Sequence, residues 1–215
     1  LFIKKKNKIL ISAYNYYNMK LVFATNNPHK LSELKTMLPK EIELLSLSDI
    51  NCHEELPETQ NTLEGNAMQK ASFVYQNYGY NCFADDTGLE IEALNNQPGV
   101  YSARYAGLHC SADDNIKKVL QQLHAENNRF ANFKTIIALI IDGQENYFEG
   151  VCSGKITLAK DGKQGFGYDP VFKPDGFEKT FAEMSKKEKG AISHRGKATK
   201  KLVQYLKIIS CQKLF

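Results

Sequence analysis

Two adjacent acidic residues, Asp85 and Asp86, follow the apolar run at residues 82–84 in the middle of the chain. Carboxylates at the end of a buried strand are costly unless a cation compensates them, and a divalent metal ion is a common solution. The pair leads into residues 87–88, which we interpret as a turn, and then into a second strand-like run at 89–94. The stretch suggests a metal-assisted site for an anionic substrate. A solvated acidic turn is the alternative, and the pair alone favours it.

A polar loop before a predicted helix is a candidate phosphate site. Residues 26–30 (Asn-Asn-Pro-His-Lys) follow a β-rich run at 20–25, with Asn27 as helix N-cap and Pro28 in the first helical position. Free amides at a helix N-terminus favour anions, and a first-turn Lys30 opposes the helix dipole, which indicates a phosphate partner. An ordinary strand-to-helix turn with an exposed lysine is an equally weighted alternative.

Three further segments carry groups that suit the same ligand. Glu58, in the acidic loop 54–58, is a second carboxylate for a hard metal ion. In the loop 163–170, two glycines flank Phe166 and permit close backbone approach, while the aromatic rings offer faces for a base. Taken alone, this loop favours a β-turn with core aromatics. The remaining cations, in a segment otherwise typical of a solvated face, are Lys189, His194 and Arg195.

The elements that must position these groups are those of an α/β protein. Apolar spacing predicts a helix at 63–78, ended by Gly79, and a helix at 112–123 with Ser111 as N-cap. Residues 130–141 give the longest strand signal, and Asp142-Gly143 predicts a hairpin turn. Further expected elements are strands at 41–47, 147–153 and 156–159 and a C-terminal helix that Ser193 caps.

The composition limits the classes of protein. The chain has 215 residues, of which 42% are hydrophobic and 24% charged, which is ordinary for a globular enzyme with a sizeable core. A net charge of +4 is too small to argue for nucleic acid, and no run is apolar enough to span a membrane. The five cysteines lack a CxxC pair, which favours reduced cytoplasmic thiols. We expect residues 1–18 to be an extension that is disordered or reflects a misassigned start.

The inventory of cations, carboxylates and aromatic faces matches a nucleoside triphosphate with Mg²⁺, although the chain has neither a P-loop nor a strand-linked GxGxxG. In five ordered blocks the sequence resembles the inosine triphosphate pyrophosphatase family, over residues 19 to about 206. The blocks are FATNNPHK (23–30), ADDTGLEIEAL (84–94), PGVYSARYAG (98–107), GFGYDPVF (165–172) and AISHRGKA (191–198).

The resemblance implies a long mixed sheet with flanking helices, in two lobes around a substrate cleft, and a homodimer. We expect a single domain over residues 19–211 and a cytoplasmic location. It implies Mg²⁺ held by Glu58 and Asp86, with Asp86 also the catalytic general base, although Asp85 and Asp86 can exchange roles. The substrate-binding residues that it implies are Thr25, Asn26, Asn27, Pro28, His29, Lys30, Thr87, Phe166, Gly167, Tyr168, Asp169, Lys189, His194 and Arg195.

The expected activity is cleavage of ITP, dITP and XTP to the monophosphate and pyrophosphate, with ATP and GTP refused. Two alternatives come from other classes. One is a pyrophosphatase for modified pyrimidine nucleotides. The other is a nucleic-acid-binding module that uses residues 186–201 on phosphates, against which the small net charge and the acids Glu58 and Asp86 both argue.

Overall fold

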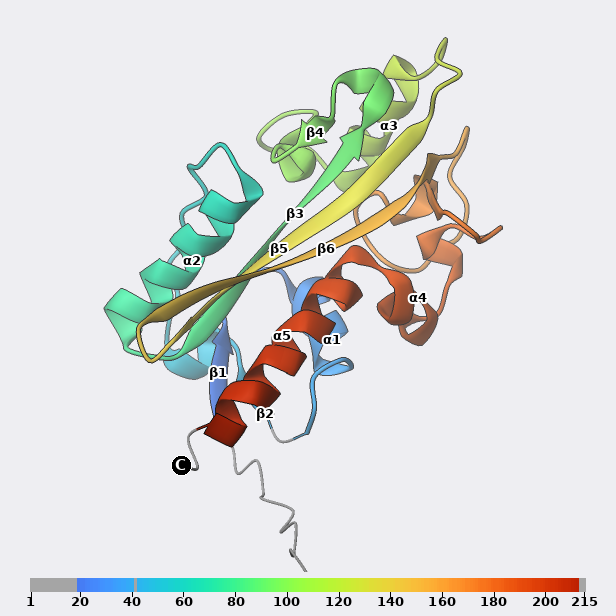
Figure 1. The fold of residues 1–215 in the computed structure, drawn as a ribbon. Helices are drawn as coiled ribbons and strands as arrows, with labels where there is room; N and C mark the ends of the chain where they lie inside the picture. The colour runs from blue at the N-terminus through green and yellow to red at the C-terminus, as the bar shows by residue number, and fades with distance from the viewer. Residues whose placement is uncertain (1–18, 41, 213–215) are drawn as a thin grey trace, which may run out of the picture.

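The computed structural model describes residues 19–40 and 42–212, so the expectation for residues 1–18 lies outside the described part (Figure 1). The helices are α1 (Pro28–Lys35), α2 (Leu63–Tyr78), α3 (Ala112–Gln122), α4 (Lys186–Ile192) and α5 (His194–Gln212). The strands are β1 (Met19–Phe23), β2 (Ile42–Leu45), β3 (Cys82–Ile91), β4 (Gln97–Gly99), β5 (Phe130–Ile141), β6 (Gln144–Ile156) and β7 (Phe172–Pro174). Within the described residues, no helix combines the length and the apolar character needed to cross a membrane.

The strands form one sheet in the order β2-β1-β3-β5-β6-β7, with β4 paired to β3. β1 runs parallel to β2 and β3, whereas the pairs that involve β4, β5, β6 and β7 are antiparallel. The long strands β3, β5 and β6 cross the molecule diagonally, with α2 on one face of the sheet and α1 and α5 on the other (Figure 1). The predicted mixed α/β sheet with flanking helices is confirmed.

Local sequence explains where the helices begin and end. The Thr62 side chain accepts a hydrogen bond from the Gly65 amide at the start of α2, and Gly79 ends it at φ 72°, a conformation that glycine adopts readily. Ser111 and Asp114 form a capping box at the start of α3. The tight turn between β5 and β6 lies at Asp142-Gly143, as the sequence predicts.

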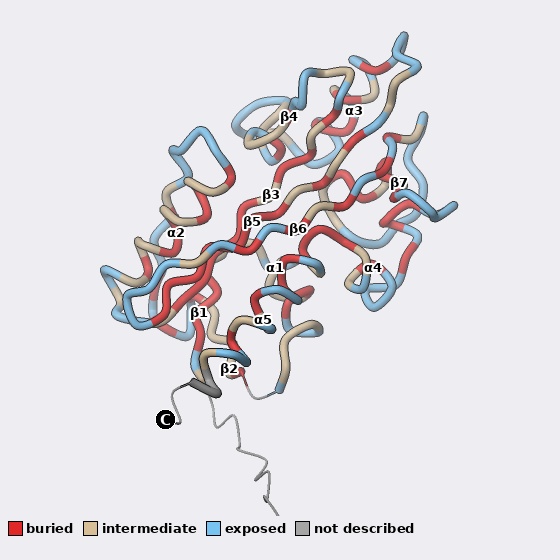
Figure 2. The backbone as a smooth tube through the Cα atoms, viewed as in Figure 1, coloured by how far each residue is buried: buried red, intermediate tan, exposed pale blue. Residues whose placement is uncertain are grey.

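Three apolar clusters hold these layers together, and the buried backbone follows the central strands (Figure 2). One cluster joins α2 to the sheet through residues such as Ala67, Val74 and Ala84. A second, on the opposite face, joins α1 and α5 to the sheet. The third lies at the far end of the long strands around Phe133 and Phe172. The first two clusters define one half of the molecule and the third defines the other half.

The expected turn at Thr87-Gly88 is wrong, because both residues lie inside the continuous strand β3. Ten successive residues of β3 pair with β5, including Thr87 with Thr135 and Gly88 with Lys134. This ladder holds the chain extended despite the glycine. The second predicted strand is therefore the end of β3, and Glu92–Leu94 is a short 3₁₀ helix. Likewise, the strand expected at 156–159 reduces to Ile156, the last residue of β6.

One edge of β3 has a break in its strand pairing. β1 pairs with β3 as far as Phe83, and β4 begins to pair at Leu89. Among the described residues, no strand covers the stretch between these two points, which we name the open edge (residues 84–88). Since the backbone N–H and C=O groups of a strand edge need hydrogen-bond partners, side chains, solvent or a ligand must supply them at the open edge.

Candidate active site

The open edge carries both adjacent carboxylates, and they point to opposite faces of the sheet. Successive side chains of a strand alternate between faces. Phe83 packs with the α5 side and Ala84 with the α2 side, so Asp85 faces α1 and α5 whereas Asp86 faces α2. The contacts of the two acids differ accordingly.

Asp85 is fully buried between two cations. Its Oδ1 accepts a hydrogen bond from Lys30 Nζ at 2.9 Å, and its Oδ2 accepts one from Arg195 Nε at 3.0 Å. Burial alone would raise the pKa of Asp85, but the charges of Lys30 and Arg195 more than offset it and hold the pKa well below its usual value. Asp85 is therefore an anion that the protein itself neutralises.

This pair belongs to a longer chain of buried charges. Glu33 of α1 accepts hydrogen bonds from Arg195 Nη1 at 2.6 Å and from Lys189 Nζ at 2.7 Å. Lys189 Nζ also donates to Asp169 Oδ2 at 2.6 Å. We call this alternating set the buried charge chain; its members are Lys30, Asp85, Arg195, Glu33, Lys189 and Asp169. It ties α1, β3, α4, α5 and the 163–170 loop to one another.

Asp86 has a different environment. Its Oδ2 accepts a hydrogen bond from Asn66 Nδ2 at 3.2 Å, and Lys70 Nζ lies 3.9 Å from its Oδ1. Burial, aided by the charge of Glu58, raises the pKa of Asp86, because Lys70 and Lys30 only partly compensate it. A carboxylate whose pKa is raised is a better proton acceptor near neutral pH.

Glu58 lies on the same side as Asp86, and Lys70 connects them. Lys70 Nζ donates to Glu58 Oε1 and also to the carbonyl of Asp85 at 2.8 Å, which serves the open edge. Burial alone would raise the pKa of Glu58, but Lys70, with smaller effects of Lys30 and Arg104, lowers it overall. Two carboxylates and an ammonium thus converge beside the unpaired backbone.

These two carboxylates suit a hard divalent cation that completes its shell with substrate oxygens and water. Mg²⁺ is commonly held by one or two carboxylates together with substrate phosphates rather than by an all-protein cage. Among the described residues, no group of three or more His, Cys, Asp or Glu side chains is arranged to hold a metal ion. The donor chemistry of Glu58 and Asp86 fits the predicted ion.

The predicted phosphate loop makes more internal hydrogen bonds than the sequence suggests. Asn27 caps α1 as expected, but its Oδ1 accepts hydrogen bonds from the amides of His29 and Lys30 at 2.9 and 3.3 Å. Two amides expected to be free therefore have an internal partner. Thr25 Oγ1 accepts from the Asn27 amide at 3.2 Å, and Asn26 and Pro28 are exposed. The loop presents Asn26, His29 and the partly exposed Thr25 beside Lys30.

The predicted base loop lies directly against this phosphate loop. The Phe166 ring stacks on His29 with centroids 5.3 Å apart, and Lys189 Nζ and the Arg195 guanidinium lie 4.9 and 5.5 Å from the same ring. Asp169 Oδ2 accepts a hydrogen bond from the Phe166 amide at 2.8 Å and so shapes the loop. Gly167, at φ 60°, adopts a left-handed conformation between the two aromatic residues.

His194 and Thr87 complete the set of predicted residues. His194 is buried and stacks on Phe133 with centroids 4.5 Å apart. Burial, with the charges of Arg195 and Lys189, lowers the pKa of His194 well below its usual value, so its imidazole is neutral. Its Nδ1 has no hydrogen-bond partner within the described ranges. Thr87 Oγ1 accepts a hydrogen bond from Arg195 Nη2 at 3.2 Å.

Two buried charged residues of this region, Glu33 and Lys70, were not predicted. Both look like ordinary helix-surface charges in the sequence. A signal exists for Lys70, because it lies seven residues after Leu63 and three after Ala67, in the buried stripe of α2. Glu33 lies three residues after Lys30, on the same face of α1.

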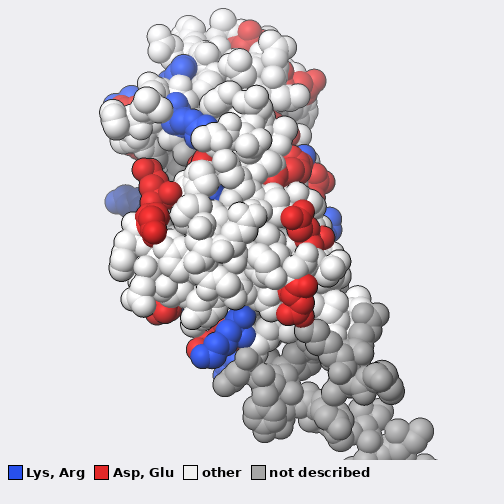
Figure 3. All heavy atoms as spheres, turned by 90° about the vertical axis from the view of Figure 1, so that its left-hand side faces the viewer, with Lys and Arg blue, Asp and Glu red and all other residues white. Residues whose placement is uncertain are grey.

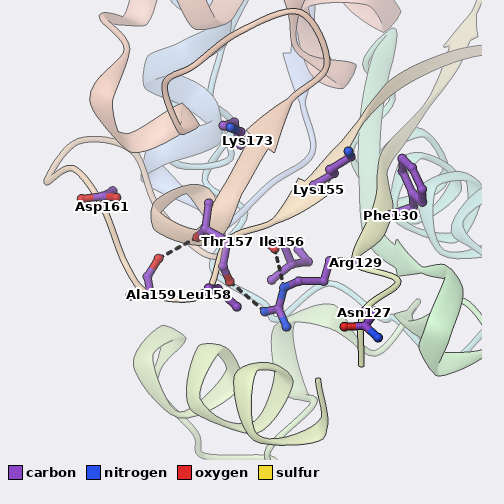
Figure 4. A pocket seen from close by; sticks show the side chains of 10 residues that line it. All are labelled: Asn127, Arg129, Phe130, Lys155, Ile156, Thr157, Leu158, Ala159, Asp161 and Lys173. Carbon is purple, nitrogen blue, oxygen red and sulfur yellow. Dashed lines mark hydrogen bonds between the residues drawn. The ribbon is translucent and has the colours of Figure 1, made fainter. Parts of the chain in front are cut away.

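A separate pocket of about 470 Å³ lies at the far end of β5 and β6 (Figure 4). None of the candidate site residues lines it. Arg129, one of its lining residues, donates its guanidinium hydrogen bonds to the carbonyls of Leu123, Ile156 and Thr157, which is a structural role. The pocket therefore adds nothing to the candidate site.

Comparison with known proteins gives a consistent result. The Ham1 family model matches residues 21–205. A dITP/XTP pyrophosphatase of Flavobacterium psychrophilum is 56% identical over 189 residues, which cover 88% of this chain and 100% of that protein. A dITP/XTP pyrophosphatase of Thermoanaerobacter pseudethanolicus is 45% identical, with 87% and 96% covered. The solved structure of a HAM1 protein from Coxiella burnetii matches with a TM-score of 0.81 and 37% identity, with 88% and 98% covered.

Proposed function

The chain belongs to the Ham1 family, and from this premise we propose that it hydrolyses ITP, dITP and XTP to the monophosphate and pyrophosphate. The observation that carries the proposal is the contrast at the open edge. One carboxylate, Asp85, is neutralised by buried cations, while its neighbour Asp86 has a raised pKa and lies beside Glu58 and Lys70. A triphosphate needs both cations for its oxygens and a base for the attacking water.

In this proposal Asp86 accepts the proton of the attacking water. Glu58 and Asp86 would hold Mg²⁺, and the ion would supply positive charge to neutralise the phosphate oxygens. Lys30 Nζ and Lys70 Nζ both donate to the backbone carbonyl of Asp85, at 3.4 and 2.8 Å, and in this proposal their ammonium groups also contact the phosphates. Asn66 orients the Asp86 carboxylate through its amide.

The base is proposed to lie against Phe166, near the cations of the buried charge chain. Inosine and xanthosine carry a 6-keto oxygen, and a donor aimed at that oxygen is left unpaired by adenine. We propose that Arg195 and His194 contact the base. The position of the Arg195 guanidinium over the Phe166 ring supports this, as does His194 Nδ1, which has no hydrogen-bond partner among the described residues. Guanine must then be refused through its 2-amino group.

A kcat/KM series over ITP, dITP, XTP, GTP and ATP with Mg²⁺, with products separated by ion exchange, tests this proposal. We expect pyrophosphate and the monophosphate as products and a preference for the first three substrates. Release of orthophosphate with a nucleoside diphosphate would contradict the reaction type. Equal use of GTP or ATP would contradict the selectivity and leave the reaction type standing.

We also propose a homodimer and a cytoplasmic location. The described cysteines Cys52, Cys82, Cys110 and Cys152 are free thiols, which suits a reducing compartment. Light scattering coupled to size-exclusion chromatography measures the oligomeric state, with about twice the chain mass of 24.3 kDa expected. A nucleic-acid-binding role has little support, because Lys189 of the basic segment is buried against Glu33 and Asp169.

A further inference from the structure

One arginine, Arg104, has no ion-pair partner among the described residues. Arg104 ends the 3₁₀ helix Ser102–Arg104, and its side chain is partly buried. Within residues 19–40 and 42–212 its guanidinium makes no hydrogen bond or ion pair, and it lies over the Tyr101 ring, 5.3 Å from the centroid. By contrast, Arg129 donates to three carbonyls and Arg195 to two carboxylates and a hydroxyl.

The backbone around Arg104 is nevertheless firmly held. Asn115 Nδ2 donates to the carbonyl of Ala103 at 3.1 Å, and Lys118 Nζ donates to the carbonyl of Tyr105. Both flanking carbonyls are therefore fixed by α3. The backbone at Arg104 is thus fixed, while its side chain has no acidic partner among the described residues. This arrangement favours a role in ligand binding over a role in stabilising the fold.

The same segment is anchored to the base loop and to β3. Ser102 Oγ accepts a hydrogen bond from the Leu89 amide at 2.9 Å and donates to the Gly99 carbonyl at 2.6 Å. The hydroxyl of Tyr168 donates to the Ser102 carbonyl at 2.9 Å. Because Leu89 is the first residue beyond the open edge, the Arg104 segment forms the wall at that end of it.

Packing places the segment that carries Arg104 on the same side of the sheet as the loop that carries Glu58. Val100, four residues earlier, packs against the cluster that contains Leu56 and Leu63, which flank Glu58 in sequence. Seen from the α2 side, basic side chains lie just above a strip of acidic ones on this face (Figure 3).

We infer that Arg104 is a further substrate-binding residue, which holds the β- and γ-phosphates that leave as pyrophosphate. The inference rests on the proposed function and extends it to a residue outside the predicted site. A guanidinium offers paired donors that match two phosphate oxygens, and that of Arg104 lies over the Tyr101 ring. Lys30 and Lys70 then contact the triphosphate from the β1 and α2 sides and Arg104 from the β4 side.

The test measures binding of Mg²⁺-pyrophosphate and of inosine monophosphate by isothermal titration calorimetry, with Arg104→Gln, Arg104→Lys and the wild type. A charge-assisted hydrogen bond contributes enough that we expect Arg104→Gln to weaken pyrophosphate binding by about 10-fold or more. Monophosphate binding should change by less than about twofold, because that product lacks the β- and γ-phosphates. Arg104→Lys should fall between Arg104→Gln and the wild type, since it keeps the charge and loses the paired donors.

The matched control is Lys117→Gln, which removes an exposed cation of α3, with 76% of the side chain accessible, in the same half of the molecule. It should bind both products as the wild type does. Unchanged pyrophosphate binding in Arg104→Gln, or equal losses for both products, would overturn the inference. Because binding is measured without turnover, a wild type that binds pyrophosphate but does not cleave ITP would contradict the proposed function alone.

Discussion

At the open edge, the two faces of β3 surround two adjacent carboxylates with different sets of charges. On the α5 face, Asp85 is enclosed by Lys30 and Arg195, and the charges continue as alternating pairs to Asp169. On the α2 face, Asp86 and Glu58 share one ammonium, that of Lys70. The pKa values of these neighbouring acids are therefore shifted in opposite directions. Burial raises the pKa of Asp86, whereas the charges of Lys30 and Arg195 outweigh burial and lower the pKa of Asp85.

This difference suggests that Asp85 has mainly a structural role and Asp86 a chemical one. A buried ion pair fixes geometry, because each member depends on the other. A carboxylate with a raised pKa reduces stability in its ionised form and gains basicity, which is a typical compromise at active sites. We therefore predict that breaking the ion pairs of the α5 face lowers the unfolding free energy, whereas substitutions of Glu58 and Asp86 on the α2 face lower turnover with less effect on stability.

The largest effect should follow from Arg195→Met. The substitution leaves Asp85 and Glu33 buried without their guanidinium, and breaking such a pair costs about 3–5 kcal/mol of unfolding free energy. Urea unfolding at pH 7 measures it. Lys134→Met is the control, since Lys134 pairs with Glu64 and Glu149 at a partly exposed position and should cost about 1 kcal/mol or less. Equal losses in the two variants would remove the distinction between the faces.

A smaller effect is expected for Glu58→Gln, on the other face. Loss of a metal-binding carboxylate should raise the Mg²⁺ concentration for half-maximal activity by at least about tenfold, the scale seen even for indirect metal partners. The measurement is a Mg²⁺ titration of ITP hydrolysis. Glu64→Gln, in the first turn of α2 and paired with Lys134, should leave the titration unchanged. An unchanged titration for Glu58→Gln would show that the metal lies elsewhere.

The smallest effect concerns how stability on the α5 face depends on pH. Burial alone would raise the pKa of Glu33, but Arg195 and Lys189 more than offset it, so the pKa is lowered from 4.5. The ionised form therefore stabilises the fold above that value, and the stabilisation is lost as the pH falls through the lowered pKa. Between pH 7 and 3.5, the melting temperature of Glu33→Gln should fall less than that of the wild type. Glu126→Gln, at an exposed position, should follow the wild type.

The parts of the fold that depend on local sequence were predictable. Asn27 and Ser111 as helix caps, Gly79 as a helix end and the turn at Asp142-Gly143 all follow from the residue itself and its immediate neighbours. The extended conformation of Thr87 and Gly88 was not predictable in this way. It is imposed by pairing with Thr135 and Lys134, more than forty residues away, which a local turn signal cannot register.

The same limit applies to the candidate site. Asp85 and Asp86 are recognisable as a pair of acids after an apolar run, but their different roles depend on which helix each one faces. Lys70 and Glu33 resemble the exposed charges common on helices until α2 and α1 are packed against the sheet. Arg104 is one cation among small residues in the sequence, and only the structure shows that its guanidinium has no ion-pair partner among the described residues.

The most direct test compares Asp85→Asn with Asp86→Asn for unfolding free energy and for kcat on ITP. Asp86→Asn should lower kcat by about 100-fold or more, the scale of lost acid–base catalysis, with unfolding free energy close to that of the wild type. Asp85→Asn should lower unfolding free energy, because it leaves Lys30 and Arg195 buried without their acid, and should retain more turnover. If Asp85→Asn folds as stably as the wild type and loses more turnover than Asp86→Asn, the assigned roles of the two faces are reversed.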